Sequence, residues 1–307
     1  MGLLDDKVAI VTGAGRGIGR GEALLLAQHG AKVLVNDLGG EWDGSGADQR
    51  PAQLVVDEIS AAGGTAAANY DDVADFAGAE RLIRQAIDTW GTLDILVNNA
   101  GILRDRMIFN MSEADWDSVI RVHLKGHFAP TRHACAYWRE RSKETGGPVG
   151  GRIIFTSSTS GLLGNAGQSN YGAAKAGIAA FAQIVSMEMS RYGVTANAIA
   201  PAARTRLTEA TFGEIKSEGS FDTWAPENIA PIVVFLATEQ AASITGQVFY
   251  TGGGSVQLYD GWGPVQEIER NERWTVEDLI DKVPGMFGDK PSAYGPPKSK
   301  LRSDVTS

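Results

Sequence analysis

The sequence has little cysteine and no long apolar run, and both absences restrict what the protein can be. Cys135 is the single cysteine among 307 residues, so no disulfide can form within the chain. This scarcity fits a reducing compartment. No run of about 18 apolar residues occurs, as a membrane-spanning helix would require. The acidic start, Met1 to Asp6, is followed at once by a strand pattern and does not resemble a secretory signal. We therefore expect a cytoplasmic protein without a membrane partner.

Positive charge is also scarce. The formal net charge is −9, and no basic stripe runs along the chain, so we expect no nucleic-acid partner. Cys135 stands among small and aromatic residues in a helical pattern, which is typical of a buried hydrophobe rather than a catalytic thiol. The sequence gives no reason to expect a bound metal.

Strand and helix patterns alternate along most of the chain. Short apolar runs bounded by turn residues predict buried strands at 7–12, 31–37, 65–69, 93–98, 152–157, 194–200 and 246–250. Longer periodic stretches predict helices at 19–29, 51–62, 76–90, 113–139, 171–191 and 226–237. This alternation predicts an α/β, doubly wound Rossmann fold with a seven-stranded parallel sheet covered on both faces.

The predicted fold divides the chain into one domain and a tail. Residues 1–255 are expected to form the domain, with ligands bound at the carboxyl ends of the strands, where strand order reverses. Residues 256–307 are expected to form a C-terminal extension whose proline-punctuated end packs loosely. A Gly- and Lys-rich insertion at about 140–150 is expected to form a surface loop.

A glycine-rich turn follows the first predicted strand. It reads T-G-x-x-x-G-x-G, and its candidate binding residues are Gly13, Gly15, Arg16, Gly17, Ile18 and Gly19. Glycines let the backbone approach a pyrophosphate, and the helix N-terminus behind them attracts its charge. Because the turn lies between the first strand and the first helix, we predict that it binds a dinucleotide.

Asp37 closes the second predicted strand. A carboxylate at this point, about 20 residues beyond the glycines, meets the ribose hydroxyls of adenosine and repels a 2′-phosphate. We therefore expect NAD rather than NADP. Arg16 argues the other way, because a basic residue in the glycine turn could bind that phosphate. Asp37 could also serve as a turn residue before Gly39.

Two other strand ends supply further candidates for cofactor binding. Asn99, Ala100 and Gly101 end the fourth strand and are small or amide residues past which a cofactor can run. Asp72 and Val73 follow the third strand. The Asp72 carboxylate either approaches the adenine amino group or acts as an acid at a helix N-terminus.

Three residues are candidates for chemistry. Tyr171 and Lys175 are four residues apart in a helical stretch and share a face. A nearby ammonium lowers the pKa of a phenol from its usual value of about 10. Ser158 lies thirteen residues before Tyr171 at a strand end, where its hydroxyl can hold a substrate oxygen while the tyrosine moves the proton. Alone, the Tyr–Lys pair is equally typical of neighbours on a helix surface.

In this order the motifs resemble the short-chain dehydrogenase/reductase family over roughly residues 5–255. The resemblance implies an oxidoreductase that interconverts a secondary alcohol and a ketone. It also implies that Ser158 positions the substrate oxygen and Tyr171 is the acid or base. By the same resemblance, Lys175 binds the nicotinamide ribose and lowers the pKa of the tyrosine.

Two positions depart from the pattern of that family. His123 stands where most members have an asparagine whose main-chain carbonyl helps hold a water between the lysine and solvent. Histidine either keeps that carbonyl role in catalysis or is a partly buried helix residue with a satisfied ring. The Pro-Gly after the sixth strand is Pro201-Ala202 here. The resemblance still implies that Pro201, Ala203 and Thr205 approach the nicotinamide.

A narrower resemblance is to the dehydrogenase portion of the peroxisomal multifunctional enzymes of type 2. It rests on residues 36–40, 69–71, 99–106, 121–124, 199–201, 206–208, 261–262 and 275–283. That portion oxidises (3R)-hydroxyacyl-CoA with NAD, and relatives act on 17β-hydroxysteroids. The resemblance implies an acyl-CoA substrate, and one version of this prediction gives the substrate a steroid-like acyl part. A free steroid, a small ketone, and a non-catalytic NAD(H)-binding scaffold stay open as alternatives.

Two further features bear on partners. Arg104 and Arg106 follow the fourth strand, and Arg204 and Arg206 follow the sixth. They either offset the phosphates of CoA in an acidic protein or pair with Asp105 and nearby acids. The predicted helices at 113–139 and 171–191 carry more apolar surface than one sheet face needs, so we expect a homodimer or homotetramer.

Overall fold

The computed structural model describes residues 2–205, 208–209 and 220–288. The chain divides into two compact units, residues 1–259 and 260–307. The first unit contains the sheet and every described candidate residue of the site.

The first unit is built on one sheet with the strand order β3-β2-β1-β4-β5-β6-β7-β8. Its strands are β1 (Val8–Thr12), β2 (Lys32–Asn36), β3 (Thr65–Asn69), β4 (Ile95–Asn98), β5 (Arg152–Thr156), β6 (Thr195–Ala202), β7 (Val248–Gly252) and β8 (Ser255–Tyr259). The strands from β3 to β7 all pair in parallel, which confirms the predicted seven-stranded parallel sheet. The prediction was wrong in stopping there, because β8 adds an eighth strand antiparallel to β7. Gly253, with φ of +56°, lies in the short turn that joins β7 to β8.

Alternating side chains of the central strands supply two hydrophobic cores. Ala9 and Val11 of β1 belong to the core on one side of the sheet. Val8 and Ile10 belong to the core on the other side. Because β1 is covered on both faces, it reads as a continuous apolar run, as buried parallel strands do.

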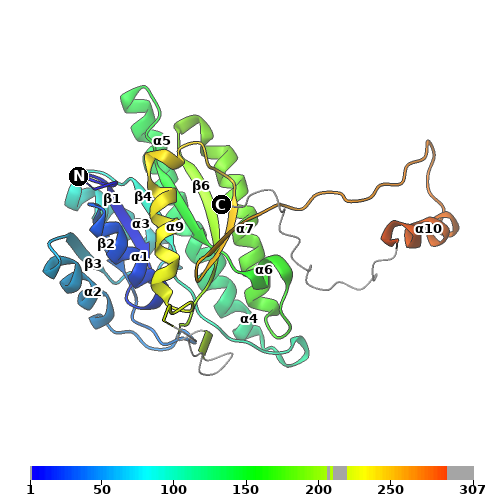
Figure 1. Cartoon of the computed structure of the whole chain (residues 1–307), viewed down its shortest axis with the longest axis horizontal. Coiled ribbons are helices and arrows are strands. Elements are labelled where there is room, and N and C mark those ends of the chain that lie inside the picture. Colours follow the sequence, from blue (N-terminus) through cyan, green and yellow to red (C-terminus); the bar gives the residue numbers. More distant parts are fainter. Residues whose placement is uncertain (1, 206–207, 210–219, 289–307) are drawn as a thin grey trace. The chain divides into compact units, whose positions relative to one another are not determined.

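Helices cover both faces of the sheet (Figure 1). They are α1 (Gly17–Gln28), α2 (Arg50–Ala61), α3 (Phe76–Trp90), α4 (Glu113–Ile120), α5 (Gly126–Thr145), α6 (Thr159–Leu163), α7 (Ser169–Met189) and α9 (Ala230–Ala237). Short 3₁₀ segments are η1 (Ile108–Asn110), η3 (Ser190–Tyr192), η4 (Pro226–Ile229) and η5 (Glu239–Ala241). Local sequence signals explain where several helices begin or end. Ser112 and Asp115 form a capping box at the start of α4. Gly91, with φ of +81°, ends α3.

The helix predicted at 113–139 is interrupted. A π-helical segment, η2 (Arg121–Lys125), separates α4 from α5. A π-turn inside a helix is often found at a functional site, and His123 lies within this one. The apolar periodicity of the sequence does not distinguish five residues of π-helix from α-helix, which is why the prediction gave one continuous helix.

The prediction of a surface loop at about 140–150 was wrong for the first half of that segment. α5 continues to Thr145 and ends at Gly146, whose φ is +72°. Glu140 accepts an ion pair from Lys143 at 2.8 Å, three residues along the same helix. Pairs at this spacing support helix, so the charged residues here extend α5, and the glycines end it.

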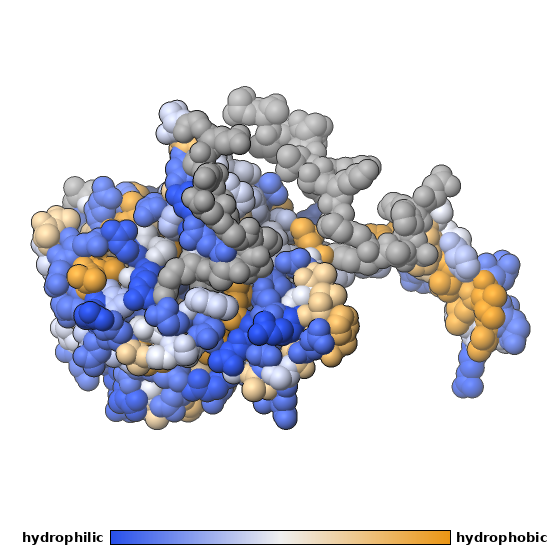
Figure 2. All heavy atoms as spheres, turned by 90° about the horizontal axis from the view of Figure 1, so that it is seen from below, coloured by the Kyte–Doolittle hydropathy of each residue, from blue (hydrophilic) through white to orange (hydrophobic). Residues whose placement is uncertain are grey.

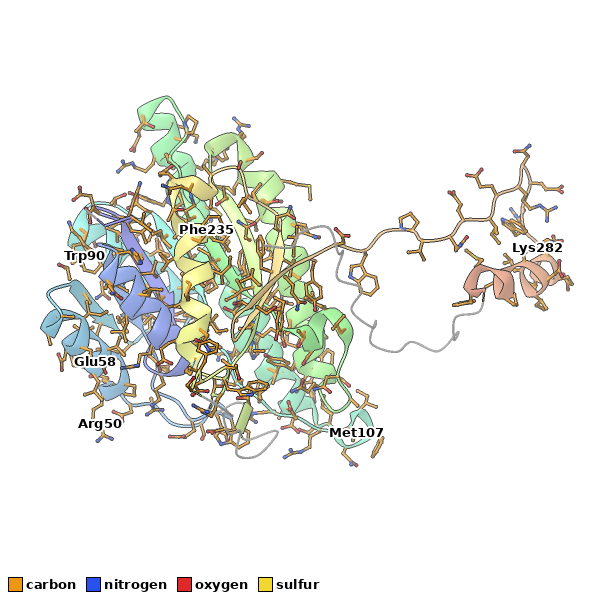
Figure 3. The ribbon with its side chains drawn as sticks, in the orientation of Figure 1. Arg50, Glu58, Trp90, Met107, Phe235 and Lys282 are labelled. Carbon is orange, nitrogen blue, oxygen red and sulfur yellow. The ribbon has the colours of Figure 1, made fainter. Side chains whose placement is uncertain are left out.

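The carboxyl ends of the strands form the edge that carries the candidate site. Strand order reverses between β1 and β4, and open α/β sheets bind ligands outside such a point. Figure 3 places Arg50 and Met107, which follow β2 and β4, at the lower end of the ribbon, and Trp90, which precedes β4, higher up. Figure 2 views the molecule from that lower end, where hydrophilic residues cover much of the described surface.

The second unit is described up to residue 288. It contains α10 (Val276–Lys282), capped by Thr275 and Asp278, and the 3₁₀ segment η6 (Val283–Phe287). Arg270 pairs with Asp278 and Glu272 and lies 5.2 Å from the centre of the Trp274 ring. The chain end that was expected to pack loosely lies outside the described residues.

Candidate active site

Gly13 and Gly19 of the turn after β1 have no room for a side chain. A Cβ on Gly13 would lie 2.7 Å from Cα of Ala100, and Gly13 has φ of +62°. A Cβ on Gly19 would lie 2.4 Å from the carbonyl oxygen of Gly13. Only glycine fits such close approaches of backbone to backbone. With these glycines packed so closely, the turn brings its main chain to the N-terminus of α1, where a pyrophosphate can bind.

Asn99 ties the end of β4 to this turn. Its side-chain amide donates to the carbonyls of Thr12 and Gly13 at 3.0 and 3.1 Å. The main-chain nitrogens of Asn99 and Ala100 donate to the Thr12 hydroxyl at 2.9 and 3.2 Å. The two strand ends at the reversal point are therefore held as one surface. Thr12 is a member of this arrangement that the sequence reasoning did not assign.

Asp37 points into the glycine turn from the end of β2. Its carboxylate accepts hydrogen bonds from the main-chain nitrogens of Gly15 at 2.7 Å and Gly39 at 2.6 Å. The bond to Gly39 is the turn-forming contact considered for this residue. The bond to Gly15 places its negative charge beside the glycine turn, and contact with a ribose stays a prediction.

Arg16 lies at the N-cap position of α1. Its Nη1 atom is buried and has no hydrogen-bond partner among the described residues. Asp37 and Arg16 argue for different cofactors. The Asp37 carboxylate is held in place by main-chain donors, whereas Nη1 of Arg16 has no hydrogen-bond partner among the described residues.

Asp72 follows β3 but is not the cap of α3. Its carboxylate pairs with Arg121 and accepts a hydrogen bond from the nitrogen of Ala74 at 2.8 Å. Asp75 is the residue that caps the helix, by accepting from Gly78 at 2.9 Å. An ion pair with η2 is thus a third role for Asp72, beyond the two considered from the sequence. Val73 beside it is buried.

The end of β6 approaches the glycine turn from the opposite side. A Cβ on Gly17 would lie 3.6 Å from the methyl group of Thr205. Thr205 is braced by Thr208, whose hydroxyl accepts from the Thr205 nitrogen at 2.7 Å. Ala203 is buried, and Pro201 lies in β6. Ile18, in the first turn of α1, is partly buried. Arg206 lies outside the described residues.

The three candidate catalytic residues come together. Ser158 caps the short helix α6 at the end of β5, and Tyr171 and Lys175 lie one turn apart in α7. The hydroxyls of Ser158 and Tyr171 are hydrogen-bonded to each other. The Nζ atom of Lys175 lies 5.4 Å from the centre of the Tyr171 ring. Two hydroxyls and an amine therefore meet at the carboxyl edge of the sheet.

Burial moves the pKa values of this group. It raises the pKa of Tyr171 to about 12, although the hydrogen bond with Ser158 acts in the other direction. It lowers the pKa of Lys175 to about 7. The sequence led us to expect a lowered tyrosine pKa. In the protein alone, removal of the phenolate from water outweighs the hydrogen bond with Ser158, and the pKa is raised rather than lowered.

The N-terminus of α7 is anchored by residues that the sequence reasoning missed. The amide of Asn170 donates to the carbonyls of Arg104 and Asp115 at 3.0 and 3.1 Å. The amide of Gln168 donates to the Asp105 carboxylate at 2.7 Å. Both link the loop after β4 to the start of the helix that carries the tyrosine, and so fix the position of its ring.

His123 is fully buried and lies beside the tyrosine. Its Nε2 atom is 2.7 Å from the carbonyl oxygen and 3.1 Å from the nitrogen of Ile102. Its ring meets that of Tyr171 edge-on, with centroids 5.1 Å apart. Burial, and then the charge of Lys175, holds the pKa of His123 well below its usual 6.5. The ring thus braces the loop after β4 against the tyrosine in a neutral state.

Other chemistry has little support among the described residues. No group of three or more His, Cys, Asp or Glu residues there is arranged to hold a metal ion. Burial raises the pKa of the Cys135 thiol to about 12, which leaves it protonated and unreactive. None of the described helices is both long and apolar enough to cross a membrane.

Comparison with known proteins agrees with this geometry. Residues 7–214 match the model of the short chain dehydrogenase family. The chain belongs to that family. Its members include a solved short chain dehydrogenase from Mycobacterium avium, 50% identical, which aligns with a TM-score of 0.85 over 96% of this chain and 99% of that one.

Two curated relatives carry more specific names. Hydroxyacyl-CoA dehydrogenase ChsB1 of Mycobacterium tuberculosis is 48% identical over 262 residues, which are 83% of this chain and 80% of the relative. Peroxisomal multifunctional enzyme type 2 of Drosophila melanogaster is 44% identical over 279 residues, which are 90% of this chain and 44% of the relative. This short chain dehydrogenase is therefore an oxidoreductase similar to proteins with those names.

Proposed function

We propose that this short chain dehydrogenase uses NAD to interconvert a 3-hydroxyacyl-CoA and a 3-ketoacyl-CoA. The observation that carries the proposal is the meeting of the Ser158 and Tyr171 hydroxyls beside Lys175, at the edge where the strand order reverses. The name of the Mycobacterium tuberculosis relative supports this class of substrate.

The three residues divide the work at the substrate oxygen. Ser158 donates a hydrogen bond that holds the oxygen, while the Tyr171 hydroxyl gives or takes the proton. When charged, Lys175 stabilises the phenolate of Tyr171. NAD, when bound, supplies the acceptor for the hydride. Gln168 and Asn170 keep the tyrosine in register with the serine.

The residues around the glycine turn fit a dinucleotide. The glycine turn lies at the N-terminus of α1, where main-chain nitrogens and the helix dipole favour a pyrophosphate. The Asp37 carboxylate is fixed beside this turn by two main-chain donors. Its charge favours ribose hydroxyls over a 2′-phosphate, which supports NAD as the cofactor.

The described arginines that follow β4 and β6 differ in their partners and exposure. Arg204 pairs with Asp222, and Arg104 donates to the carbonyl of Asp43 at 3.0 Å. Arg106 likewise donates to a main-chain carbonyl, that of Asp105 at 2.7 Å, but it is exposed, whereas Arg104 is partly buried. Arg106 is therefore the arginine whose substitution best tests the phosphate role.

The test follows NADH absorbance with four alcohols. They are a 3-hydroxyacyl-CoA, the same acyl group on a short thiol without the nucleotide, a 17β-hydroxysteroid and a small secondary alcohol. We expect oxidation of the CoA thioester, and a raised, salt-dependent KM for that thioester in Arg106→Gln. The KM of the truncated thioester should stay unchanged in the variant.

Other outcomes select the alternatives. Equal effects of Arg106→Gln on both thioesters would reject the phosphate role. Oxidation of the free steroid without oxidation of the CoA thioester would reject the substrate class. Tight NADH binding with turnover of none of the alcohols would favour a non-catalytic scaffold. The cytoplasmic location remains an expectation from composition.

A further inference from the structure

A buried amide network joins the carboxyl ends of β2 and β3, which lie side by side (Figure 1). Asn36 is the last residue of β2 and Asn69 is the last residue of β3. Their side chains are buried, with the residues 2% and 4% exposed. The β2–β3 ladder ends at this pair, so side chains must fix the loops that follow.

The side-chain amide of Asn69 uses all of its hydrogen-bonding positions. Its Oδ1 atom accepts from Nδ2 of Asn36 at 2.7 Å and from the main-chain nitrogen of Asp71 at 3.0 Å. Its Nδ2 atom donates to the Asp71 carboxylate at 2.9 Å and to Oε1 of Gln85 at 2.8 Å. An amide has two donors and two lone pairs, so Asn69 is saturated. Turned over, the amide would place its nitrogen against two donors, and the network therefore fixes its orientation as well.

On the β2 side the network reaches the glycine turn. Nδ2 of Asn36 also donates to the carbonyl of Asp71 at 2.9 Å. The main-chain carbonyl of Asn36 accepts from the nitrogen of Ala14, in the glycine turn, at 2.9 Å. The next residue, Asp37, accepts from the nitrogen of Gly15 in the same turn. A shift of Asn36 would therefore move the Asp37 carboxylate relative to the turn.

On the β3 side the network fixes the start of the loop that carries Asp72 and Val73. The nitrogen and one carboxylate oxygen of Asp71 are held by Asn69. The other carboxylate oxygen pairs with Arg81 of α3 at 2.6 Å. Asp71 is thus held between β3 and α3, and the loop after it begins from a fixed point.

We propose that Asn69 is a positioning residue for the adenosine half of the dinucleotide. Through Asn36 it sets the Asp37 carboxylate, and through Asp71 it sets the chain that leads to Asp72. The catalytic group follows β5, on the other side of the strand-order reversal. Loss of Asn69 should therefore weaken cofactor binding and leave the chemical step intact. This inference rests on the contact with adenosine proposed above for Asp37.

The test measures binding of NADH and of ADP-ribose to the full chain by calorimetry, without any alcohol. ADP-ribose contains the adenosine and the pyrophosphate but no nicotinamide. Asn69→Leu keeps the volume and removes the four hydrogen bonds of the amide. Asn36→Ala is a milder variant, because Asn69 keeps its bonds to Asp71 and Gln85.

The matched control is Asn197→Leu, in β6. Asn197 is 1% exposed, and its amide donates to the carbonyl of Ile244 at 2.8 Å and accepts from the nitrogen of Gln247 at 3.0 Å. It is therefore a buried and bonded asparagine on the other side of the strand-order reversal. Thermal unfolding of every variant measures how much each change destabilises the fold.

We expect Asn69→Leu and Asn36→Ala each to raise the Kd of NADH about tenfold, which corresponds to the net worth of about one hydrogen bond. The Kd of ADP-ribose should rise by the same factor, and kcat at saturating NAD should stay unchanged. Asn197→Leu should lower the Tm without changing either Kd. If Asn69→Leu does not fold, Asn36→Ala decides.

Three results would overturn the proposal. The first is an unchanged Kd of NADH in Asn36→Ala. The second is a rise for NADH without one for ADP-ribose, because the effect would then lie at the nicotinamide half. The third is an equal rise of Kd in Asn197→Leu, which would indicate loss of stability rather than of position.

Binding and turnover separate this inference from the proposed function. NADH binding by the unsubstituted protein without oxidation of a 3-hydroxyacyl-CoA would reject the substrate class and leave the binding result standing. Failure of the unsubstituted protein to bind NADH would reject the proposed cofactor and this inference together.

Discussion

Gly101 and His123 are in direct contact, and the contact leaves no room for a side chain on Gly101. A Cβ there would lie 2.3 Å from Cε1 of the imidazole. His123 thus requires glycine at position 101, in the loop after β4. The same ring meets Tyr171 edge-on, so a side chain at position 101 that displaced the imidazole would also disturb the tyrosine.

We therefore expect Gly101→Ala to lower the free energy of unfolding by about 1–3 kcal/mol, the usual cost of overpacking a core, and to reduce turnover. The measurements are denaturant unfolding and NADH-linked activity. His123→Asn alone should remain active, because its main-chain carbonyl is kept, and its shorter side chain should rescue Gly101→Ala in the double variant. The control is Gly147→Ala, where a Cβ would meet no atom within 4 Å. A double variant no better than Gly101→Ala would show that the contact is not the cause.

Tyr171→Phe removes the hydroxyl that is bonded to Ser158 but keeps the ring against His123. We expect turnover to fall by about 10²–10⁴, the usual worth of general acid–base catalysis. NADH binding, measured by fluorescence, should survive. Turnover close to that of the unsubstituted enzyme would mean that another group moves the proton.

Asp37→Asn tests the choice of cofactor. The change removes the charge while keeping one acceptor for the nitrogens of Gly15 and Gly39. Two charges about 4 Å apart near a protein surface interact by several kcal/mol, so the preference for NAD should fall at least about tenfold in kcat/KM. Arg16→Gln is the companion variant. If the unsubstituted enzyme prefers NADP and Arg16→Gln abolishes that preference, Asp37 does not decide the cofactor.

Light scattering tests the expected homodimer or homotetramer. α5 and α7 expose large apolar side chains, among them Phe128 on α5 and Ile184 and Met187 on α7. Such surface on neighbouring helices is typical of contacts between subunits. A particle of 32.5 kDa, the mass of one chain, at micromolar concentration would contradict this prediction.

The sequence predicted those parts of the site whose residues lie close together along the chain. The glycine turn and the Tyr171–Lys175 pair each lie within one turn or one helix, so their spacing alone carries the geometry. The alternation of strands and helices likewise predicted the parallel sheet, because each buried strand is its own apolar run.

The parts that escaped prediction depend on residues far apart in the chain. Gln168 meets Asp105 across 63 positions, and Lys175 meets a main-chain carbonyl, which every residue possesses. No side-chain pattern marks such contacts in advance.

A buried acid of α1 predicts how stability depends on pH. Glu22 of α1 is fully buried, and neither carboxylate oxygen has a hydrogen-bond partner among the described residues. Burial raises its pKa from 4.5 to about 8. Between these values the folded protein keeps the proton while the unfolded chain loses it. The folded state then binds more protons, so the free energy of unfolding falls as pH rises through this window.

Glu22→Gln removes this titration, and the difference in stability between variant and unsubstituted protein should grow between pH 5 and pH 8. The shift of Glu22 sets an upper bound of about 5 kcal/mol at the rate of 1.36 kcal/mol for each pKa unit. Relaxation around the buried acid will make the measured gain smaller. Denaturant unfolding at several pH values measures it, with Glu188→Gln, an exposed acid of α7, as the control. Stability curves of Glu22→Gln and the unsubstituted protein that run parallel across this window would mean that Glu22 does not hold a proton in the folded state.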